Sequence, residues 1–146
     1  MSQENVEFVR ALQPPPGADI AELFRDDLSW AALSASLSSA LAPDVECAGR
    51  GFPGLDDTVF AGLDGLRSAW LEWLAPWVSY RTEVEQTIDL GDKVVILVRD
   101  FARKSDSTPE VMLTSAAVWT VRDGKVARIE FCADRDTALK AVGLED

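Results

Sequence analysis

Histidine does not occur anywhere in this chain of 146 residues. Histidine is the commonest general base in enzymes, the usual partner of serine and cysteine nucleophiles, and the commonest transition-metal ligand. Its absence excludes Ser-His and Cys-His catalysis and argues against a zinc site. The two cysteines, Cys47 and Cys132, have no further ligand at metal-binding spacing, and carboxylates alone favour magnesium or calcium. We therefore expect no metal site and no cofactor.

Basic residues are also few, with 14 lysines and arginines against 25 acidic residues and a net charge of -11. A chain this acidic repels phosphate backbones and anionic lipid surfaces, which argues against nucleic acid and membrane surfaces as partners. No apolar run approaches the roughly 20 residues of a membrane span. The opening MSQENVEFVR lacks the basic-then-apolar order of a secretory signal. These features predict a cytoplasmic protein with two reduced thiols and no membrane segment.

The composition is that of a globular protein, with 47% hydrophobic and 27% charged residues. A chain of this length can bury about two-thirds of its unfolded surface around one core. The sequence shows no repeat, low-complexity run or glycine-rich phosphate loop. We expect a single domain over residues 1–146.

The first half of the chain shows helical patterns bounded by capping residues and prolines. Asp19, Asp64 and either Asp26 or Asp27 can each accept a hydrogen bond from the first turn of a following helix. The segment QPPPG at 13–17 must end the first helix, because proline cannot continue it. We expect helices over residues 4–12, 19–24, 26–41 and 64–78, a short strand over 45–48, and a loop over 49–57.

The second half alternates between apolar and polar residues in long runs separated by turn signals. It predicts four strands, over residues 80–90, 94–103, 111–121 and 125–133, and a closing helix that Asp134 caps. Helices first and a long antiparallel meander afterwards indicate an α+β fold. We expect a curved antiparallel sheet of these four strands and the short strand at 45–48, packed on the N-terminal helices.

The hairpin over residues 113–133 decides which side chains face the interior. Asp123-Gly124 could form a two-residue turn, but we prefer a three-residue turn with Gly124 as a bulge. That register leaves one mostly apolar face and one mixed face. The apolar face would hold Leu113, Ser115, Ala117, Trp119, Val121, Ala127, Ile129 and Phe131. The mixed face would hold Thr114, Ala116, Val118, Thr120, Arg128, Glu130 and Cys132.

Five stretches carry a resemblance to a known family: SQENVEFVR at 2–10, APDVE at 42–46, FAGLDGLRSAWLEWL at 60–74, VWTVRDGKVARIEF at 118–131 and ADRDTALKAVGL at 133–144. Together they resemble the SnoaL-like branch of the nuclear transport factor 2-like superfamily. The resemblance implies a cone-shaped fold with a pocket between the concave sheet face and the helices, and often a homodimer through the other sheet face. Residues 13–40 depart from the family pattern and leave the roof of the pocket open to question.

The family contains ketosteroid isomerases, polyketide cyclases, epoxide hydrolases and dehydratases as well as binding modules, so the resemblance implies no single function. Carried over position by position, most of the enzyme patterns fail. Ala117 stands where a steroid isomerase has an acid, and Phe131, Val45 and Cys47 replace three polar residues of the epoxide hydrolases. Asp100 survives, level with the other hydrolase acid.

Asp100 has two interpretations. Strand alternation turns it inward with Val94, Ile96, Val98 and Ala102, where loss of solvation would raise its pKa toward the range of a general base. The alternative is a twisted or bulged strand, in which Asp100 reaches the rim and pairs with Arg99, Arg103 or Arg128.

The aromatic residues also have two interpretations. Trp70, Trp73 and Trp77 share a helical stripe and would form core or line a ligand, and Trp119 would narrow the pocket opposite Ala127. Tyr80, the only tyrosine, could supply a phenol, but its place at a helix-to-strand junction leads us to expect a surface anchor.

We expect this chain to be a SnoaL-like pocket protein that binds a small apolar molecule. The alternative is an isomerase, cyclase or hydrolase that uses Asp100 as general base on a polyketide-like or terpenoid-like compound. The mixed hairpin face, on which Arg128 and Glu130 could pair between chains or be solvated, predicts a homodimer. The expected ligand-binding residues are Val45, Cys47, Trp73, Trp77, Val98, Ala117, Trp119, Ile129 and Phe131, with Asp100 as the catalytic candidate.

Overall fold

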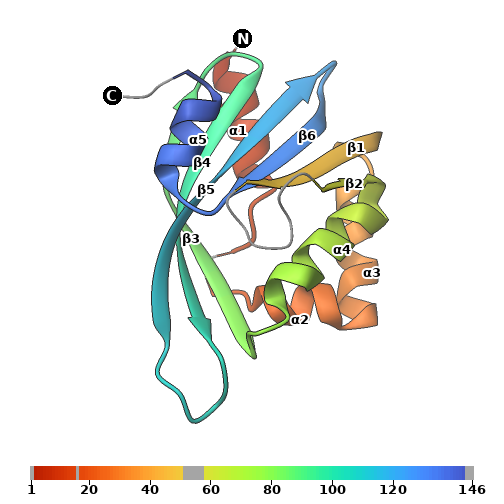
Figure 1. Cartoon of the computed structure of the whole chain (residues 1–146). Helices are drawn as coiled ribbons and strands as arrows, with labels where there is room; N and C mark the ends of the chain where they lie inside the picture. Colours follow the sequence, from red (N-terminus) through yellow and green to blue (C-terminus); the bar gives the residue numbers. More distant parts are fainter. Residues whose placement is uncertain (1, 16, 51–57, 144–146) are drawn as a thin grey trace.

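The computed structural model describes residues 2–15, 17–50 and 58–143. Within this part of the chain a six-stranded curved sheet has the order β2-β1-β6-β5-β4-β3 (Figure 1). Neighbouring strands are antiparallel except β1 and β6, which run parallel. The strands are β1 (Leu41–Arg50), β2 (Val59–Ala61), β3 (Ser79–Asp89), β4 (Lys93–Arg103), β5 (Val111–Arg122) and β6 (Lys125–Cys132). The α+β class and the four long strands predicted from the sequence are confirmed.

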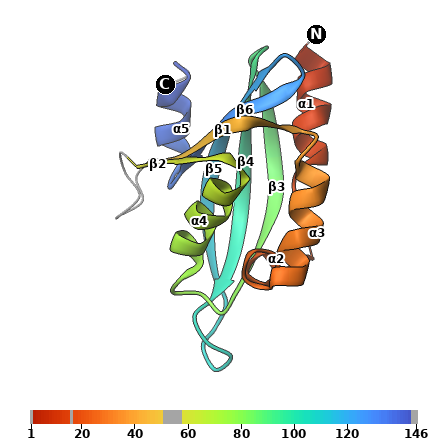
Figure 2. The same cartoon turned by 90° about the vertical axis from the view of Figure 1, so that its right-hand side faces the viewer.

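Helices cover both faces of the sheet. The helices are α1 (Ser2–Ala11), α2 (Ile20–Arg25), α3 (Asp27–Leu37), α4 (Gly62–Leu74) and α5 (Arg135–Ala141). Figures 1 and 2 show α1 to α4 on the concave side of the sheet and α5 on the opposite, convex side. No helix among the described residues has the length and apolar character needed to cross a membrane.

Three aspartates start helices as expected. The carboxylates of Asp19, Asp26 and Asp134 accept backbone N–H groups of Ala21, Ser29 and Thr137, respectively. These bonds satisfy donors that have no partner inside the helix. Asp26 is therefore the cap that the sequence left open between Asp26 and Asp27.

Two predicted helices are too long. The third helix ends at Leu37, because the chain from Leu41 onward pairs with β6 and the N–H of Val126 donates to the Ala40 carbonyl at 2.9 Å. The strand expected at 45–48 extends over residues 41–50, and the remainder of the expected loop, residues 51–57, lies outside the described residues. Helix α4 ends at Leu74, two residues before Pro76, which is consistent with the poor fit of proline to a helix interior.

The start of α4 also differs from the prediction. Its N-cap is Ala61, without a side-chain cap, and Asp64 lies in the first turn. The chain enters this helix from β2, a three-residue strand too short to give a sequence pattern.

The β5–β6 turn is a two-residue turn, and the three-residue turn preferred from the sequence is wrong. Both Asp123 and Gly124 have positive φ, 54° and 77°, as a type I′ turn requires. A shift in pairing follows inside β6, between Thr120↔Arg128 and Val121↔Val126. Val126 therefore joins the inner face in place of Ala127, while the pairs Ala117↔Phe131 and Trp119↔Ile129 keep their expected inner side.

Two separate apolar clusters follow from this register. The larger one lies between the concave face and α1, α2, α3 and α4. The smaller one lies on the convex face and consists of Val95, Leu97, Ala116, Val118, Cys132 and Ala138, the last from α5. Helix α5 thus covers much of the mixed hairpin face within a single chain.

The reason given for a homodimer is therefore wrong, since Ala116, Val118 and Cys132 are buried without a second chain. Arg128 and Glu130 pair with each other, and Arg128 also reaches Glu46 of β1. A homodimer stays a prediction, but an exposed hairpin face no longer supports it.

Gly65 provides a test of how closely α4 packs on β2. A Cβ at this position would stand 2.7 Å from the Phe60 carbonyl carbon. We expect Gly65→Ala to destabilise the protein by about 1–3 kcal/mol, because backbone must move. Helix propensity alone would favour alanine by about 1 kcal/mol. Urea unfolding measures the difference.

Gly17→Ala is the control for this prediction, because its added Cβ meets no heavy atom within 4 Å. It should leave stability within about 0.5 kcal/mol. An alanine at Gly65 that stabilises the protein would contradict the packing described.

Candidate functional site

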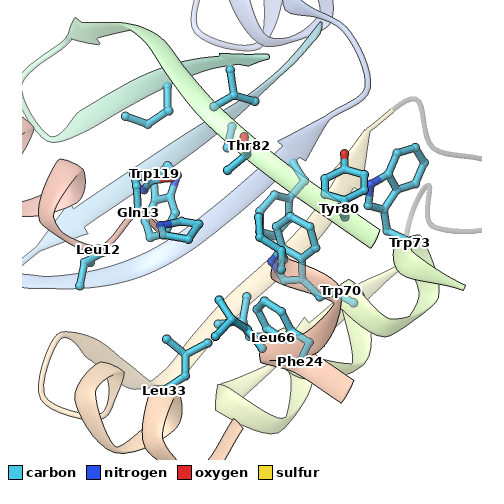
Figure 3. Close-up of a pocket in the computed structure, with 18 of the residues that line it drawn as sticks. Leu12, Gln13, Phe24, Leu33, Leu66, Trp70, Trp73, Tyr80, Thr82 and Trp119 are labelled. Atoms are coloured by element: carbon cyan, nitrogen blue, oxygen red, sulfur yellow. The ribbon is translucent and has the colours of Figure 1, made fainter. Parts of the chain in front are cut away.

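A cavity of about 440 Å³ lies between the concave face and the helices. Its wall is mostly apolar and comes from α1, α2, α3, α4 and the inner face of the sheet. Figure 3 shows Phe24, Leu33 and Leu66 on one side and Thr82 on the other. Polar side chains in the described wall are few: Gln13, Ser36, Tyr80, Thr82, Asp100 and Ser115, together with the indole groups of Trp70, Trp73 and Trp119.

Asp100 lies in this wall and is only 4% exposed. Three hydroxyl groups donate to its carboxylate. Tyr80 and Ser115 donate to Oδ2 at 2.8 and 2.7 Å, and Thr82 donates to Oδ1 at 2.8 Å. The donors come from β3 and β5, the two strands that flank β4, at positions that alternation also turns inward. The inward orientation expected for Asp100 agrees with this placement.

Burial raises the pKa of Asp100, and this effect is the largest that acts on it. The hydrogen bonds from Ser115, Thr82 and Tyr80 act in the opposite direction, as does the more distant positive charge of Arg135. The rim interpretation is wrong, because none of the three arginines named for it contacts Asp100. Arg99 pairs with Glu85, Arg103 donates to the Thr108 carbonyl, and Arg128 pairs with Glu46 and Glu130.

Tyr80 is a buried part of the site, and the expectation of a surface anchor is wrong. It is 2% exposed, and its ring makes edge contacts with Trp70, Trp73 and Trp77 at centroid distances of 6.0, 6.3 and 6.3 Å. The Trp73 indole also donates a hydrogen bond to the Tyr80 hydroxyl, which in turn donates to Asp100. Burial, foremost, and the neighbouring carboxylate raise the pKa of Tyr80, so the phenol stays protonated.

Five of the nine expected ligand-binding residues line the cavity: Trp73, Val98, Ala117, Trp119 and Phe131. The other four, Val45, Cys47, Trp77 and Ile129, are absent from the described wall. Val45, Cys47 and Ile129 are fully buried in the core, where Cys47 pairs with Ile129 across β1 and β6. Trp77 lies beyond the end of α4, beside Lys104.

Burial also decides the chemistry of Cys47. Burial raises the pKa of the Cys47 thiol to about 12, although the positive charge of Arg128 acts to lower it. At neutral pH this side chain is a protonated thiol, which is a poor nucleophile. Cys47 is therefore part of the packed core.

Sequence reasoning missed most of the roof of the cavity. Residues 11–15 and Ala18, together with Phe24, Leu33, Phe60 and Trp70, contribute to the wall. Prolines keep this segment from forming helix where it crosses from α1 to α2, and its Leu12 and Gln13 line the same cavity as Trp119 (Figure 3). The departure of residues 13–40 from the family pattern was the available signal.

Two further observations concern polar groups. Trp119 Nε1 is buried and has no hydrogen-bond partner within the described structure. Among the residues that the structure describes, no three histidine, cysteine or acidic side chains gather where they could hold a metal ion.

The model of the SnoaL-like domain family matches residues 6–129 of this chain. No curated protein matches the chain significantly. The match thus runs from within α1 into β6 and includes strands β1 to β5.

Several solved structures share the fold. TerC, co-crystallised with polyporic acid, is 23% identical with a TM-score of 0.63, and 96% of each chain is covered. A candidate SnoaL-like polyketide cyclase from Jannaschia sp. CCS1 is 18% identical with a TM-score of 0.64, covering 97% of this chain and 90% of that one. A nuclear transport factor 2-like protein of unknown function from Burkholderia pseudomallei K96243 is 18% identical with a TM-score of 0.61, covering 93% and 95%. At these identities the likeness shows the fold alone.

Asp100→Asn tests the buried carboxylate through the pH dependence of stability. A folded-state pKa above the unfolded value of about 3.9 means that stability falls as pH rises from that value through the folded pKa. Asparagine keeps the shape without the charge, so the variant should lack this fall and be the more stable protein above neutral pH. Urea unfolding across a pH series measures the slope. Equal slopes in both proteins would contradict a raised pKa.

Proposed function

Because the chain belongs to the SnoaL-like domain family, we propose that it is a pocket protein that binds a small, mainly apolar molecule between its sheet and its helices. One observation carries the proposal: the 440 Å³ cavity, whose described wall is apolar apart from a few polar groups. Ligand sites typically span about 300–1,000 Å³ and combine an apolar lining with a small number of polar groups.

The aromatic rings of the wall support this class of ligand. Phe24 stacks on Trp70, and Trp70 meets Phe131 edge to face, at centroid distances of 5.3 and 5.4 Å. Aromatic side chains contribute large apolar contact areas. The co-crystal of TerC with polyporic acid supports a small-molecule ligand for a cavity of this fold, without specifying which one this chain takes.

A catalytic role for Asp100 is the second candidate, and the three hydroxyls that hold its carboxylate favour it. In this mechanism Asp100 takes a proton from carbon next to a carbonyl group, and the electron pair moves to the carbonyl oxygen as an enolate. Such a step would serve an isomerase or cyclase acting on a polyketide-like or terpenoid-like compound, and water activation by the same base would serve a hydrolase.

The catalytic candidate ranks second because the enolate oxygen also needs a donor. Tyr80, Thr82 and Ser115 already donate to Asp100. The unpaired Trp119 indole lies opposite Val94, six residues along β4 from Asp100, which is roughly 20 Å of strand. A bound substrate would have to bring its own stabilisation or draw a hydroxyl away from Asp100.

Filling the cavity should weaken ligand binding. The neutral apolar dye N-phenyl-1-naphthylamine should fluoresce strongly with the wild-type protein. Ala117→Phe places a ring in the cavity wall and should weaken dye binding by about tenfold or more, or 1.4 kcal/mol. Ala31→Phe adds the same ring at an exposed position on α3 and should leave binding unchanged. Equal binding by the two variants, with circular dichroism showing both folded, would refute the proposal.

Deuterium exchange tests the catalytic candidate. If Asp100 is a base, wild-type protein should accelerate exchange of the α-protons of 2-tetralone in D₂O, followed by NMR. Asp100→Asn should slow it by about 100-fold or more. Tyr80→Phe removes a hydrogen bond that lowers the Asp100 pKa, so its pH–rate profile should shift upward. The exposed control Asp106→Asn should match wild type, and no acceleration by wild type would remove the candidate.

A further inference from the structure

Asp100 is the only side chain in the described cavity wall that carries a full charge near neutral pH when ionised. The same wall contains no lysine or arginine. A ligand that enters the cavity therefore meets negative charge or none. The sign of any charge on the ligand is thereby restricted by the protein.

No cationic side chain among the described residues contacts this carboxylate. The arginines on β3 and β4 are engaged elsewhere: Arg81 with Glu83 and Glu110, Arg99 with Glu85, and Arg103 with the Thr108 carbonyl. Arg135 pairs with Glu85 and donates to the Val98 carbonyl. An ionised Asp100 has only neutral hydroxyls in direct contact and the positive charge of Arg135 farther away. Buried charges usually have a charged partner in contact.

The hydrogen bonds leave one acceptor position open. A carboxylate oxygen has two lone pairs. Oδ2 accepts from Tyr80 and Ser115, whereas Oδ1 accepts only from Thr82 in the described structure. Because Asp100 belongs to the cavity wall, a donor on the ligand can use the second lone pair of Oδ1.

Aromatic rings surround this end of the cavity. Tyr80, whose hydroxyl touches Asp100, is in ring contact with Trp70 and Trp73, which also line the wall. Figure 3 shows Tyr80 and Trp73 side by side, with Trp70 nearby. Aromatic rings attract cations, and they do so more strongly where water is excluded.

We propose that the ligand of this cavity carries one protonated amine on an apolar body, and that the amine binds at Asp100 beside Tyr80, Trp70 and Trp73. The inference rests on the proposed binding function and not on the catalytic candidate, since an ammonium group on Oδ1 would occupy the base. The ammonium group of the ligand supplies Asp100 with the positively charged partner that the described wall lacks. An anionic ligand has no lysine or arginine to pair with in the described wall, and the net charge of -11 repels it further.

A matched series of ligands tests the charge preference. The three probes are 2-(1-naphthyl)ethylamine, 2-(1-naphthyl)ethanol and 1-naphthylacetate, which share one ring system and differ in end group. Calorimetry at neutral pH should show the amine binding at least about tenfold more tightly than the alcohol, and the acetate more weakly than the alcohol.

Asp100→Asn should bring the amine to within about threefold of the alcohol while leaving the alcohol affinity unchanged. Asp106→Asn removes one exposed negative charge far along the β4–β5 loop, so it should keep the full amine preference and controls for the net charge. The wild-type series decides the question by itself if Asp100→Asn does not fold.

Equal affinity for amine and alcohol would overturn the inference and leave the binding function standing. No binding of any of the three matched probes, while N-phenyl-1-naphthylamine still binds, would do the same. An amine preference that survives in Asp100→Asn would also overturn it. Failure of the dye to bind the wild-type protein would remove the binding function, and this inference with it.

Discussion

The buried carboxylate of Asp100 is the constraint on which the arrangement of the central strands depends. Its three hydroxyl donors come from both neighbouring strands, Tyr80 and Thr82 from β3 and Ser115 from β5. A slip of one residue in either pairing would turn the donors to the convex face and leave the carboxylate without partners. A buried polar group without partners costs about 1–3 kcal/mol, and a charged one costs more. The observed register of β3, β4 and β5 is therefore the one that supplies hydrogen-bond donors to Asp100.

This register gives the two faces of the sheet different roles. Ile96, Val98 and Ala117 face the cavity, whereas Val95, Leu97 and Val118, their neighbours in sequence, pack on the convex side with α5. The concave side keeps space because prolines carry the chain across it between α1 and α2. On the convex side, α5 packs directly on the sheet. The cavity and the buried carboxylate of Asp100 therefore both lie on the concave side.

Strand alternation and capping residues were enough to predict the four long strands, three helix starts and the inward side of Asp100, because these depend on local spacing. They did not predict β2 or the parallel pairing of β1 with β6, which depend on contacts distant in sequence. The partners of Asp100 depend on which strands are neighbours and in what register, which is why Tyr80 was misplaced. Tyr80 and Thr82 do share a face in β3, and that spacing of two residues was the available signal. The turn at Asp123-Gly124 was misjudged because its bulge lies inside β6, where no glycine marks it. The roof of the cavity could not be predicted, because a proline-rich segment lacks the helical or strand periodicity from which its position could be inferred.

An apolar cavity and a desolvated carboxylate each reduce stability when the protein is empty. In this chain the cavity and the buried carboxylate of Asp100 occur together. Hydroxyls from two strands stabilise that carboxylate, although a packed apolar core in the same place could be equally or more stable. A ligand that fills the cavity and donates a hydrogen bond to Oδ1 of Asp100 would offset both destabilising effects. Any ligand that binds only the folded state raises its stability by mass action. The structural cost of the cavity and its capacity for binding thus have the same origin. In the described cavity a small molecule can take the place of side chains.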